Sequence, residues 1–234
     1  MNRFPVVDIF GPTIQGEGPV IGRPSVFVRF GGCDFRCKWC DSLHAVDPAF
    51  KGAWRSLSGT DILDEMDRLS KGRPLLVTLT GGNPALHDLG DLIRQGKKRG
   101  YMFLVETQGS KVQEWFKDLE LLVLSPKGPS AGVNQDEAVL RECLELYPRK
   151  LPKALKVSIF SDEDYAYAKS LAGRYPHIPF YLQVGNLSPN GPLDEEFLKQ
   201  RFRLLAERLE KDGWFTVTLL PQLHVWAWGN ERCR

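Results

Sequence analysis

Residues 25–42 read SVFVRFGGCDFRCKWCDS, an apolar and β-branched run followed by three closely spaced cysteines. The first six residues are typical of a buried strand. Cys33, Cys37 and Cys40 follow within eight positions, in a chain that has five cysteines in all. Three thiols this close together are typical of a metal-binding loop, so we expect such a loop at the carboxyl end of the strand.

Further strands and helices alternate along the rest of the chain. Apolar or β-branched runs like the one at 25–30 recur at 75–80, 101–107, 119–125, 154–160, 179–184 and 215–220. Between them, apolar residues share one helix face at Ile62, Leu63, Met66 and Leu69, then at Leu89, Leu92 and Ile93, and later at Val139, Leu140, Cys143, Leu144 and Tyr147. Two more helices are expected at 162–175, with Ser161 as the N-cap, and at 194–211, ended by Gly213.

This alternation predicts an α/β fold with parallel strands, built from βαβ units. At 234 residues the chain is close in length to one complete α/β barrel, which has about 250 residues. We therefore expect a single domain spanning 1–234. Its form would be a partial (β/α) barrel, abbreviated where the segments between strands are short.

The composition is that of an ordinary globular protein: 42% of the residues are hydrophobic and 26% are charged, with 31 basic and 29 acidic side chains. This balance gives no reason to expect a nucleic-acid partner. No apolar stretch approaches the roughly 18 residues that a membrane span needs, so no membrane partner is expected. The odd number of cysteines and the absence of an apolar leader favour a reducing, cytoplasmic location.

Polar segments follow the predicted strands at the points where they end. They are GGNP (81–84), ETQGS (106–110), SPKGPS (125–130), GN (185–186) and PQLH (221–224). Because parallel strands present their carboxyl ends on one rim, these segments and the cysteine loop are expected to line one cavity.

Spacing alone leaves two interpretations of the cysteine loop. Three thiolates can bind three irons of a cubane cluster and leave the fourth iron open to a small molecule. Alternatively, His44 lies four positions after Cys40, so the three cysteines and His44 can form a closed zinc site. Cys143 lies on an apolar helix face and is expected in the core, whereas Cys233 has no predicted role.

Together these motifs resemble a known family. The C-x3-C-x2-C loop and GGNP are similar to the signature of radical S-adenosylmethionine enzymes. The ordered set IFGPTIQGEG (9–18), residues 27–42, TGGNPAL (80–86), ETQG (106–109), LSPK (124–127), FYLQVGN (180–186) and LLPQLHVWAWGN (219–230) resembles the 7-carboxy-7-deazaguanine synthase family.

The resemblance implies the fold of a radical S-adenosylmethionine enzyme and three cofactors. A 4Fe-4S cluster would be held by Cys33, Cys37 and Cys40 in a loop within 31–44, and Mg2+ by Ser42. Contacts to S-adenosylmethionine are implied for Trp39, Cys40, Asp41, Gly81, Gly82, Asn83, Ser125, Pro126, Lys127, Gln183, Val184, Gly185 and Asn186. Asn83 departs from the glutamate that is more frequent in this motif, but its amide oxygen can still accept from an ammonium group.

The implied activity is that of a lyase in 7-deazapurine (queuosine precursor) biosynthesis. It converts 6-carboxy-5,6,7,8-tetrahydropterin to 7-carboxy-7-deazaguanine with loss of ammonia. Substrate contacts are implied for Ile14, Gln15, Gly16, Glu17, Arg29, Thr80 and His224. No catalytic side chain is expected, because the radical is generated on the cofactor.

The resemblance also implies protein partners and leaves two alternatives. An electron-donor protein such as flavodoxin or ferredoxin is expected, as is a homodimer. A glycyl-radical activase would share the cysteine loop and the glycine motif, and a structural zinc-binding module would use His44.

Overall fold

The computed structural model describes residues 2–145, 151–189 and 191–233. In this part of the chain the strands form one nine-stranded sheet in the order β3-β1-β2-β4-β5-β6-β7-β8-β9. The strands are β1 (Arg3–Ile14), β2 (Pro24–Phe30), β3 (Arg55–Ser58), β4 (Leu76–Gly81), β5 (Met102–Thr107), β6 (Leu121–Leu124), β7 (Lys153–Ile159), β8 (Phe180–Val184) and β9 (Val217–Leu220). From β2 to β9 every neighbouring pair is parallel, which agrees with the predicted sheet.

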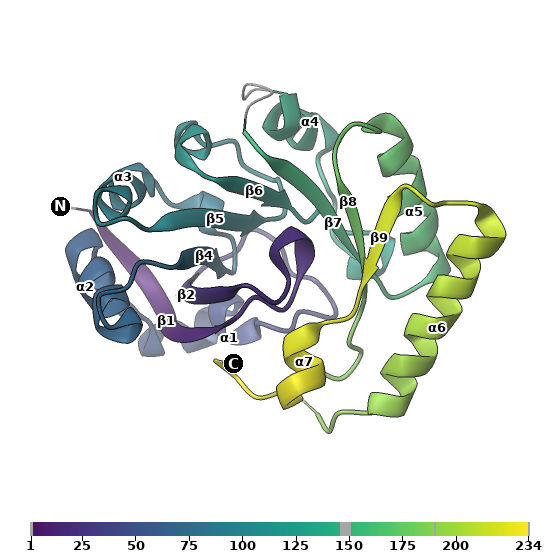
Figure 1. Cartoon of the computed structure of the whole chain (residues 1–234), viewed down its shortest axis with the longest axis horizontal. Coiled ribbons are helices and arrows are strands. Elements are labelled where there is room, and N and C mark those ends of the chain that lie inside the picture. The colour runs from purple at the N-terminus through teal and green to yellow at the C-terminus, as the bar shows by residue number, and fades with distance from the viewer. Residues whose placement is uncertain (1, 146–150, 190, 234) are drawn as a thin grey trace.

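Five helices cover the outer side of the curved sheet (Figure 1). They are α2 (Gly59–Ser70), α3 (Gly90–Lys98), α4 (Glu137–Glu145), α5 (Asp162–Arg174) and α6 (Glu195–Asp212). Shorter helices are α1 (Leu43–Val46) and α7 (Leu223–Trp228), with single 3-10 turns at Gly18–Val20, Pro48–Ala53, Pro84–Leu86, Glu114–Asp118 and Pro129–Ala131. This arrangement is the predicted partial barrel.

The edge formed by β1 and β3 was not predicted. Both strands are antiparallel to their neighbours, so the prediction of parallel strands is incomplete at this edge. β1 contains Pro5 and Pro12, residues that usually disqualify a segment as a central strand, and its pairing with β2 shifts register twice. β3 has four residues, two of them exposed, and so lacks a hydrophobic signal.

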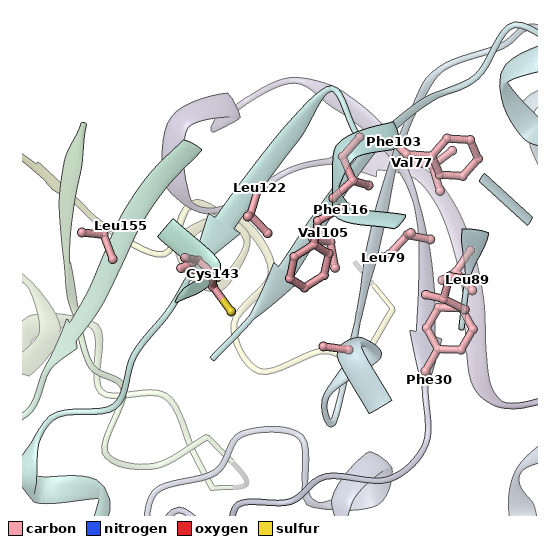
Figure 2. Close-up of a cluster of buried hydrophobic side chains, with 14 of the residues drawn as sticks. Phe30, Val77, Leu79, Leu89, Phe103, Val105, Phe116, Leu122, Cys143 and Leu155 are labelled. Carbon is pink, nitrogen blue, oxygen red and sulfur yellow. The ribbon is translucent and has the colours of Figure 1, made fainter. Parts of the chain in front are cut away.

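Alternation along the strands separates the core from the interior of the partial barrel. Val77, Leu79, Phe103, Val105 and Leu155 face the helices and pack with the other apolar side chains in Figure 2. A second, small cluster of Leu76, Leu104 and Val123, capped by Val20, lies apart from this core. Polar side chains such as those of Thr78 and Lys156 occupy the alternate positions of the same strands.

The ends of the helices follow the predicted capping chemistry. Ser161 Oγ accepts from Asp164 N at 3.3 Å in a capping box, and Gly213 ends α6 with φ +60°. Cys143 on α4 is buried in the core, as predicted. Tyr147 lies outside the described residues.

The segments that follow β1 and β9 meet across the open side of the sheet. Leu223 N donates to Gly16 O at 2.9 Å, and Gln222 Nε2 donates to Glu17 Oε1 at 2.7 Å. The two distant ends of the sheet are therefore connected at the rim where the polar loops gather. Among the described residues, no helix combines the length and the apolar character needed to span a membrane.

Candidate active site

A cavity of about 770 Å³ opens at the carboxyl ends of the parallel strands. It collects most of the residues that the sequence predicts for cofactor and substrate contacts. Those lining it are Ile14, Gln15, Gly16, Glu17, Arg29, Cys33, Cys37, Trp39, Cys40, Asp41, Ser42, Thr80, Gly81, Gly82, Ser125, Lys127, Gly185, Asn186 and His224. The expected convergence on one rim is therefore observed.

Side chains from the segments that follow β4 and β5 hold the start of the cysteine loop. Asp34 Oδ1 accepts from Gln108 Nε2 at 2.7 Å and from Asn83 Nδ2 at 2.9 Å. Gln108 Nε2 also lies 3.6 Å from Cys33 Sγ, within reach of an N–H to sulfur hydrogen bond. The loop is thus anchored beside the first cysteine by amide side chains.

The far end of the loop is held by Trp39. Its indole Nε1 donates to Ser130 Oγ at 2.8 Å, and its ring stacks on Phe160 with centroids 4.1 Å apart. Lys127 Nζ lies 5.8 Å from the centre of the same ring and 3.2 Å from Ser125 Oγ. Trp39 therefore joins the cysteine loop to the segments that follow β6 and β7.

Burial raises the pKa of each thiol in the loop. The pKa of Cys37 rises to about 11, and those of Cys33 and Cys40 also lie above the ordinary value. At neutral pH these groups are therefore thiols in the protein alone. A metal centre must displace their protons as it binds, which is usual for thiolate ligands.

The zinc interpretation needs His44 beside the cysteines, and the structure directs this side chain elsewhere. His44 Nε2 lies 3.6 Å from Asp8 Oδ2. The hydrogen bond from His44 outweighs burial and lowers the pKa of Asp8, and the Arg29 charge acts in the same direction. In residues 2–145, 151–189 and 191–233, no three His, Cys, Asp or Glu side chains are grouped closely enough to hold one metal ion. The alternative Cys3His arrangement is not formed among these residues.

The glycine turn after β4 packs directly against the cysteine loop. A Cβ on Gly82 would lie 2.1 Å from Gly32 O, and one on Gly81 would lie 2.1 Å from Phe30 O. Gly81 also has φ +138°, a conformation that favours glycine. Both positions require glycine because of these backbone contacts.

Four predicted cofactor contacts lie behind the cavity wall and not on it: Asn83, Pro126, Gln183 and Val184. Asn83 is fully buried, and its Oδ1 accepts from Thr107 Oγ1 at 2.7 Å and from Ala85 N at 3.1 Å. Gln183 Nε2 donates to Pro221 O at 3.2 Å. The expected acceptor role of Asn83 toward an ammonium group does not fit these bonds, because its amide oxygen already accepts two hydrogens within the protein.

The predicted substrate wall is held by contacts within the protein. Gln15 Nε2 lies 3.3 Å from Thr78 Oγ1, and Arg29 Nε lies 3.4 Å from Asp8 Oδ2. A Cβ on Gly16 would lie 2.0 Å from His224 Nδ1, so the imidazole packs against that glycine.

Glu17 has a strongly perturbed environment. Burial favours its neutral form, but the charge of Lys156, with contributions from His224 and Gln222, lowers its pKa to about 2. Glu17 is therefore an ionised carboxylate at the edge of the cavity.

Asp8 and Lys156 line the cavity and were not predicted there, whereas Glu106, Gln108 and Gln222 lie in segments that were expected at the cavity but were given no individual role. Lys156 lies in the middle of an apolar strand, and a lysine inside such a run is the signal that could have revealed it. Glu106 belongs to a segment noted for its position at a strand end. Asp8 lies on β1, the strand that was itself missed.

The C-terminal segment also contributes to the cavity. Cys233, to which no role was assigned, lines it together with Glu231 and Arg232. The Cys233 thiol contacts Asp8. Burial raises the pKa of this thiol, and the negative charge of Asp8 raises it further.

Comparison with known proteins first defines the class. The profile of the Radical SAM superfamily matches residues 27–126, which include the cysteine loop and the glycine turn. Among solved structures, QueE from Escherichia coli shares the fold, with a TM-score of 0.69, 24% identity and 95% of each chain covered. SuiB from Streptococcus suis, solved with S-adenosylmethionine bound, gives a TM-score of 0.56 at 12% identity over 81% of this chain and 48% of that one. The chain therefore contains a region that matches radical S-adenosylmethionine proteins, and it has the fold of these two structures.

Two relatives then define the family. Proteins named 7-carboxy-7-deazaguanine synthase from Bacillus cereus and Bacillus subtilis are 37% and 39% identical to this chain. The alignments span 99% of both chains for the first relative and 98% of both chains for the second. The protein belongs to the 7-carboxy-7-deazaguanine synthase family, and it is accordingly an enzyme of the radical S-adenosylmethionine class.

Family membership implies a 4Fe-4S cluster and S-adenosylmethionine as cofactors. The residues present fit both groups, because three thiols and a glycine turn line one cavity. The alternatives of a glycyl-radical activase and a structural zinc module are not supported, since relatives over nearly the whole chain are synthases.

Proposed function

We propose that this protein is a 7-carboxy-7-deazaguanine synthase. It converts 6-carboxy-5,6,7,8-tetrahydropterin to 7-carboxy-7-deazaguanine with release of ammonia, and the whole chain acts as one radical S-adenosylmethionine domain. The observation that carries the proposal is the single cavity in which a cysteine loop faces a wall of carboxylate, amide and guanidinium groups. Such a cavity suits a flat heterocycle that carries a carboxylate.

Cys33, Cys37 and Cys40 are proposed to hold the 4Fe-4S cluster. With three protein ligands, one iron is left open for S-adenosylmethionine. When bound, these two groups supply the radical chemistry that removes a hydrogen atom from the substrate. The protein's task is to orient the reactants and exclude water.

The cofactor side of the cavity is proposed to consist of Trp39, Asp41, Gly81, Gly82, Ser125, Lys127, Gly185 and Asn186, which all line it. The glycines let backbone groups approach the cofactor closely. Asn83, Pro126, Gln183 and Val184 would support this wall from behind. Asn83 in particular links the glycine turn to Asp34 of the cysteine loop, with its Nδ2 donating to Asp34 Oδ1 at 2.9 Å.

The substrate side is proposed to consist of Ile14, Gln15, Gly16, Glu17, Arg29, Thr80 and His224. Glu17 accepts from the amino and N–H edge of the heterocycle as an ionised acceptor. The terminal nitrogens of Arg29 bind the substrate carboxylate, while its Nε stays paired with Asp8.

Ser42 is proposed to bind Mg2+ through its hydroxyl. The side chain lines the cavity two residues after Cys40, and its Oγ lies 3.8 Å from Cys40 Sγ. Substrate oxygens and waters would complete the shell of a hard cation. There the metal would stabilise negative charge that develops on the substrate.

Two protein partners and a location complete the proposal. A flavodoxin or ferredoxin supplies electrons to the cluster, and the enzyme works in the cytoplasm, where its free cysteines stay reduced.

A second copy of the chain forms a homodimer over Trp226 of α7, a residue that is 64% exposed. Sedimentation should give twice the mass of the chain, and Trp226→Lys should give the monomer.

The decisive experiment compares the wild type with Cys37→Ala after anaerobic purification. The wild type should be brown with close to four irons per chain. It should convert the pterin when given S-adenosylmethionine, dithionite and Mg2+. Cys37→Ala should lose both the iron and the activity. Cys143→Ala is the matched control, because it removes a buried core thiol away from the cavity and should keep the iron.

The result can also go against the proposal. Zinc in place of iron in the wild type would refute the cluster assignment. A protein with four irons that cleaves S-adenosylmethionine but leaves the pterin unchanged would refute the substrate assignment.

A further inference from the structure

Lys156 is a buried cation inside the partial barrel. It lies in the middle of β7, and its side chain is 5% exposed. Lys156 Nζ lies 3.3 Å from both carboxylate oxygens of Glu106 on β5, and it also donates to Glu17 Oε2. One ammonium group therefore bridges two carboxylates that come from segments far apart in the sequence.

The surroundings of this group hold few other charges. His224 faces Glu17 from the start of α7, and Gln222 Nε2 donates to Glu17 Oε1 at 2.7 Å. Glu17, Glu106 and Lys156 together carry a formal charge of −1 beside the cavity. A wall of this charge favours a ligand that presents N–H donors.

Burying a lysine at this position costs free energy, and only its contacts with these carboxylates offset that cost. Removing an ammonium group from water carries a penalty of several kcal/mol, which only close, well-placed partners offset. The residues on either side of Lys156, Leu155 and Val157, are fully buried in the core on the helix-covered face, whereas Lys156 points into the interior of the partial barrel, where its charge meets the two carboxylates. Conversely, without the lysine two carboxylates would face each other with no cation between them.

We propose that Lys156 is a positioning residue that holds Glu17 and Glu106 at fixed spacing on the cavity wall. Together the two carboxylates then receive the N–H donors of the aminopyrimidinone edge of the substrate. This inference rests on the proposed function for the identity of the substrate. The bridging geometry itself stands on the contacts of Lys156.

Substrate binding tests the role directly. Lys156→Met removes the charge and keeps the length of the side chain. We expect it to raise the Kd for 6-carboxytetrahydropterin, measured by titration calorimetry on the cluster-loaded protein, at least tenfold. Iron content and the Kd for S-adenosylmethionine should stay at the wild-type values. Lys153→Met, in the same strand but outside the cavity wall, should leave the pterin Kd within twofold of wild type.

The dependence of Tm on pH distinguishes the effect of the Lys156 charge from the effect of the side-chain shape. This profile can be recorded on protein without cluster or substrate. In the wild type the Glu17 pKa of about 2 lies below the ordinary 4.5, so Glu17 stabilises the fold above pH 4.5. That stabilisation is lost as the pH falls toward 2. In Lys156→Met the cation that lowers the pKa of Glu17 is gone and burial raises that pKa, so this variant should gain stability as the pH falls. The difference in Tm between the two proteins should therefore be largest near pH 8 and shrink toward pH 5. His224 is present in both proteins.

A double variant keeps the test usable if Lys156→Met folds poorly. Glu106→Gln added to Lys156→Met removes one of the two facing charges. It should recover most of the lost Tm at pH 8, but not the affinity for the pterin.

The outcomes distinguish the two proposals. A wild type that does not bind the pterin refutes the proposed substrate, while the Tm profile still tests the bridge. If the wild type binds the pterin and Lys156→Met shows the same Kd and the same Tm profile, the role of Lys156 is overturned. Equal Tm losses in Lys156→Met and the double variant would also overturn it, because the loss would then come from shape and not from charge.

Discussion

Gly82 lies where the glycine turn presses against the cysteine loop. A Cβ at this position would lie 2.1 Å from Gly32 O, one residue before Cys33. We predict that Gly82→Ala lowers the free energy of unfolding by about 1–3 kcal/mol, as expected for overpacking. Because the displaced backbone precedes a cluster ligand, iron content should fall as well. Urea unfolding of the cluster-free protein and iron analysis of the loaded protein measure the two effects.

Gly52→Ala is the matched control. No heavy atom lies within 4 Å of the Cβ that this substitution adds, and the position is exposed. It should change the free energy of unfolding by less than about 0.5 kcal/mol. If Gly82→Ala behaves like Gly52→Ala in both measurements, the close approach of the two loops has no functional consequence.

Single residues also show how far a sequence can predict a site. The cysteines and glycines are recognisable because their types and spacing are specific to their chemistry. Lys156 is recognisable only in part: a lysine inside an apolar strand marks the position as unusual, but it gives no sign of the two carboxylates that the lysine meets. For Asn83 the motif position predicts a cofactor contact, which stays a prediction, but it gives no sign of the hydrogen bonds that this side chain makes within the protein.

At the scale of elements, Asp164 ties the start of α5 to the loop that follows β6. Asp164 Oδ2 accepts from the backbone N–H groups of Phe160 and Ser161 at 2.9 and 3.1 Å, and Oδ1 accepts from Ser130 N at 3.0 Å. Ser130 in turn accepts the indole N–H of Trp39. One buried carboxylate therefore fixes two loops that hold the cysteine loop.

We predict that Asp164→Ala lowers the free energy of unfolding by at least about 3 kcal/mol. Three backbone donors lose their acceptor, and each buried donor left unsatisfied costs about 1–3 kcal/mol. Urea unfolding of the cluster-free protein measures the loss.

Asp61→Ala on α2 is the control, because Asp61 occupies the same place in the other capping box but is exposed. It should cause a clearly smaller loss of stability. Equal losses in the two variants would mean that Asp164 acts only as a helix cap.

Elements differ in how well the sequence predicts them. The strands that pair in parallel carry apolar or β-branched runs, and each was expected near its observed position. In β2 and β4 to β8 most residues are buried, because both faces of these strands lie inside the protein, whereas no residue of the edge strand β9 is buried. β1 was missed because its signal is broken by prolines and by Asp8. Asp8 pairs with Arg29 and His44, so the prediction that missed β1 also missed these two contacts in the site.

At the scale of the whole molecule, the cavity is completed by contacts between segments that the sequence cannot pair. The residues after β1, β8 and β9 meet only because the sheet curls, which brings α7 beside the segment that follows β1 (Figure 1). Periodicity and turn signals report on neighbours along the chain. They carry no information on these long-range hydrogen bonds.

Asn230 is the clearest of these long-range contacts. Its Nδ2 donates to Ser188 O at 2.9 Å and to Gly191 O at 2.8 Å, and its Oδ1 accepts from Asn186 Nδ2 at 2.9 Å. Asn186 lines the cavity on the proposed cofactor side. The C-terminal segment therefore sets the position of a wall that lies more than 40 residues earlier in the sequence.

We predict that Asn230→Ala weakens S-adenosylmethionine binding several-fold while the protein stays folded. Three hydrogen bonds are lost, each with a net contribution of about 1 kcal/mol, and the Asn186 side chain loses the acceptor that orients it. Titration calorimetry on the cluster-loaded protein gives the Kd, and Tm confirms folding. Asn134→Ala, at an exposed position outside the cavity wall, should retain the wild-type Kd. If Asn230→Ala also retains it, the C-terminal segment only covers the cavity, and the wall around Asn186 is positioned by β8 alone.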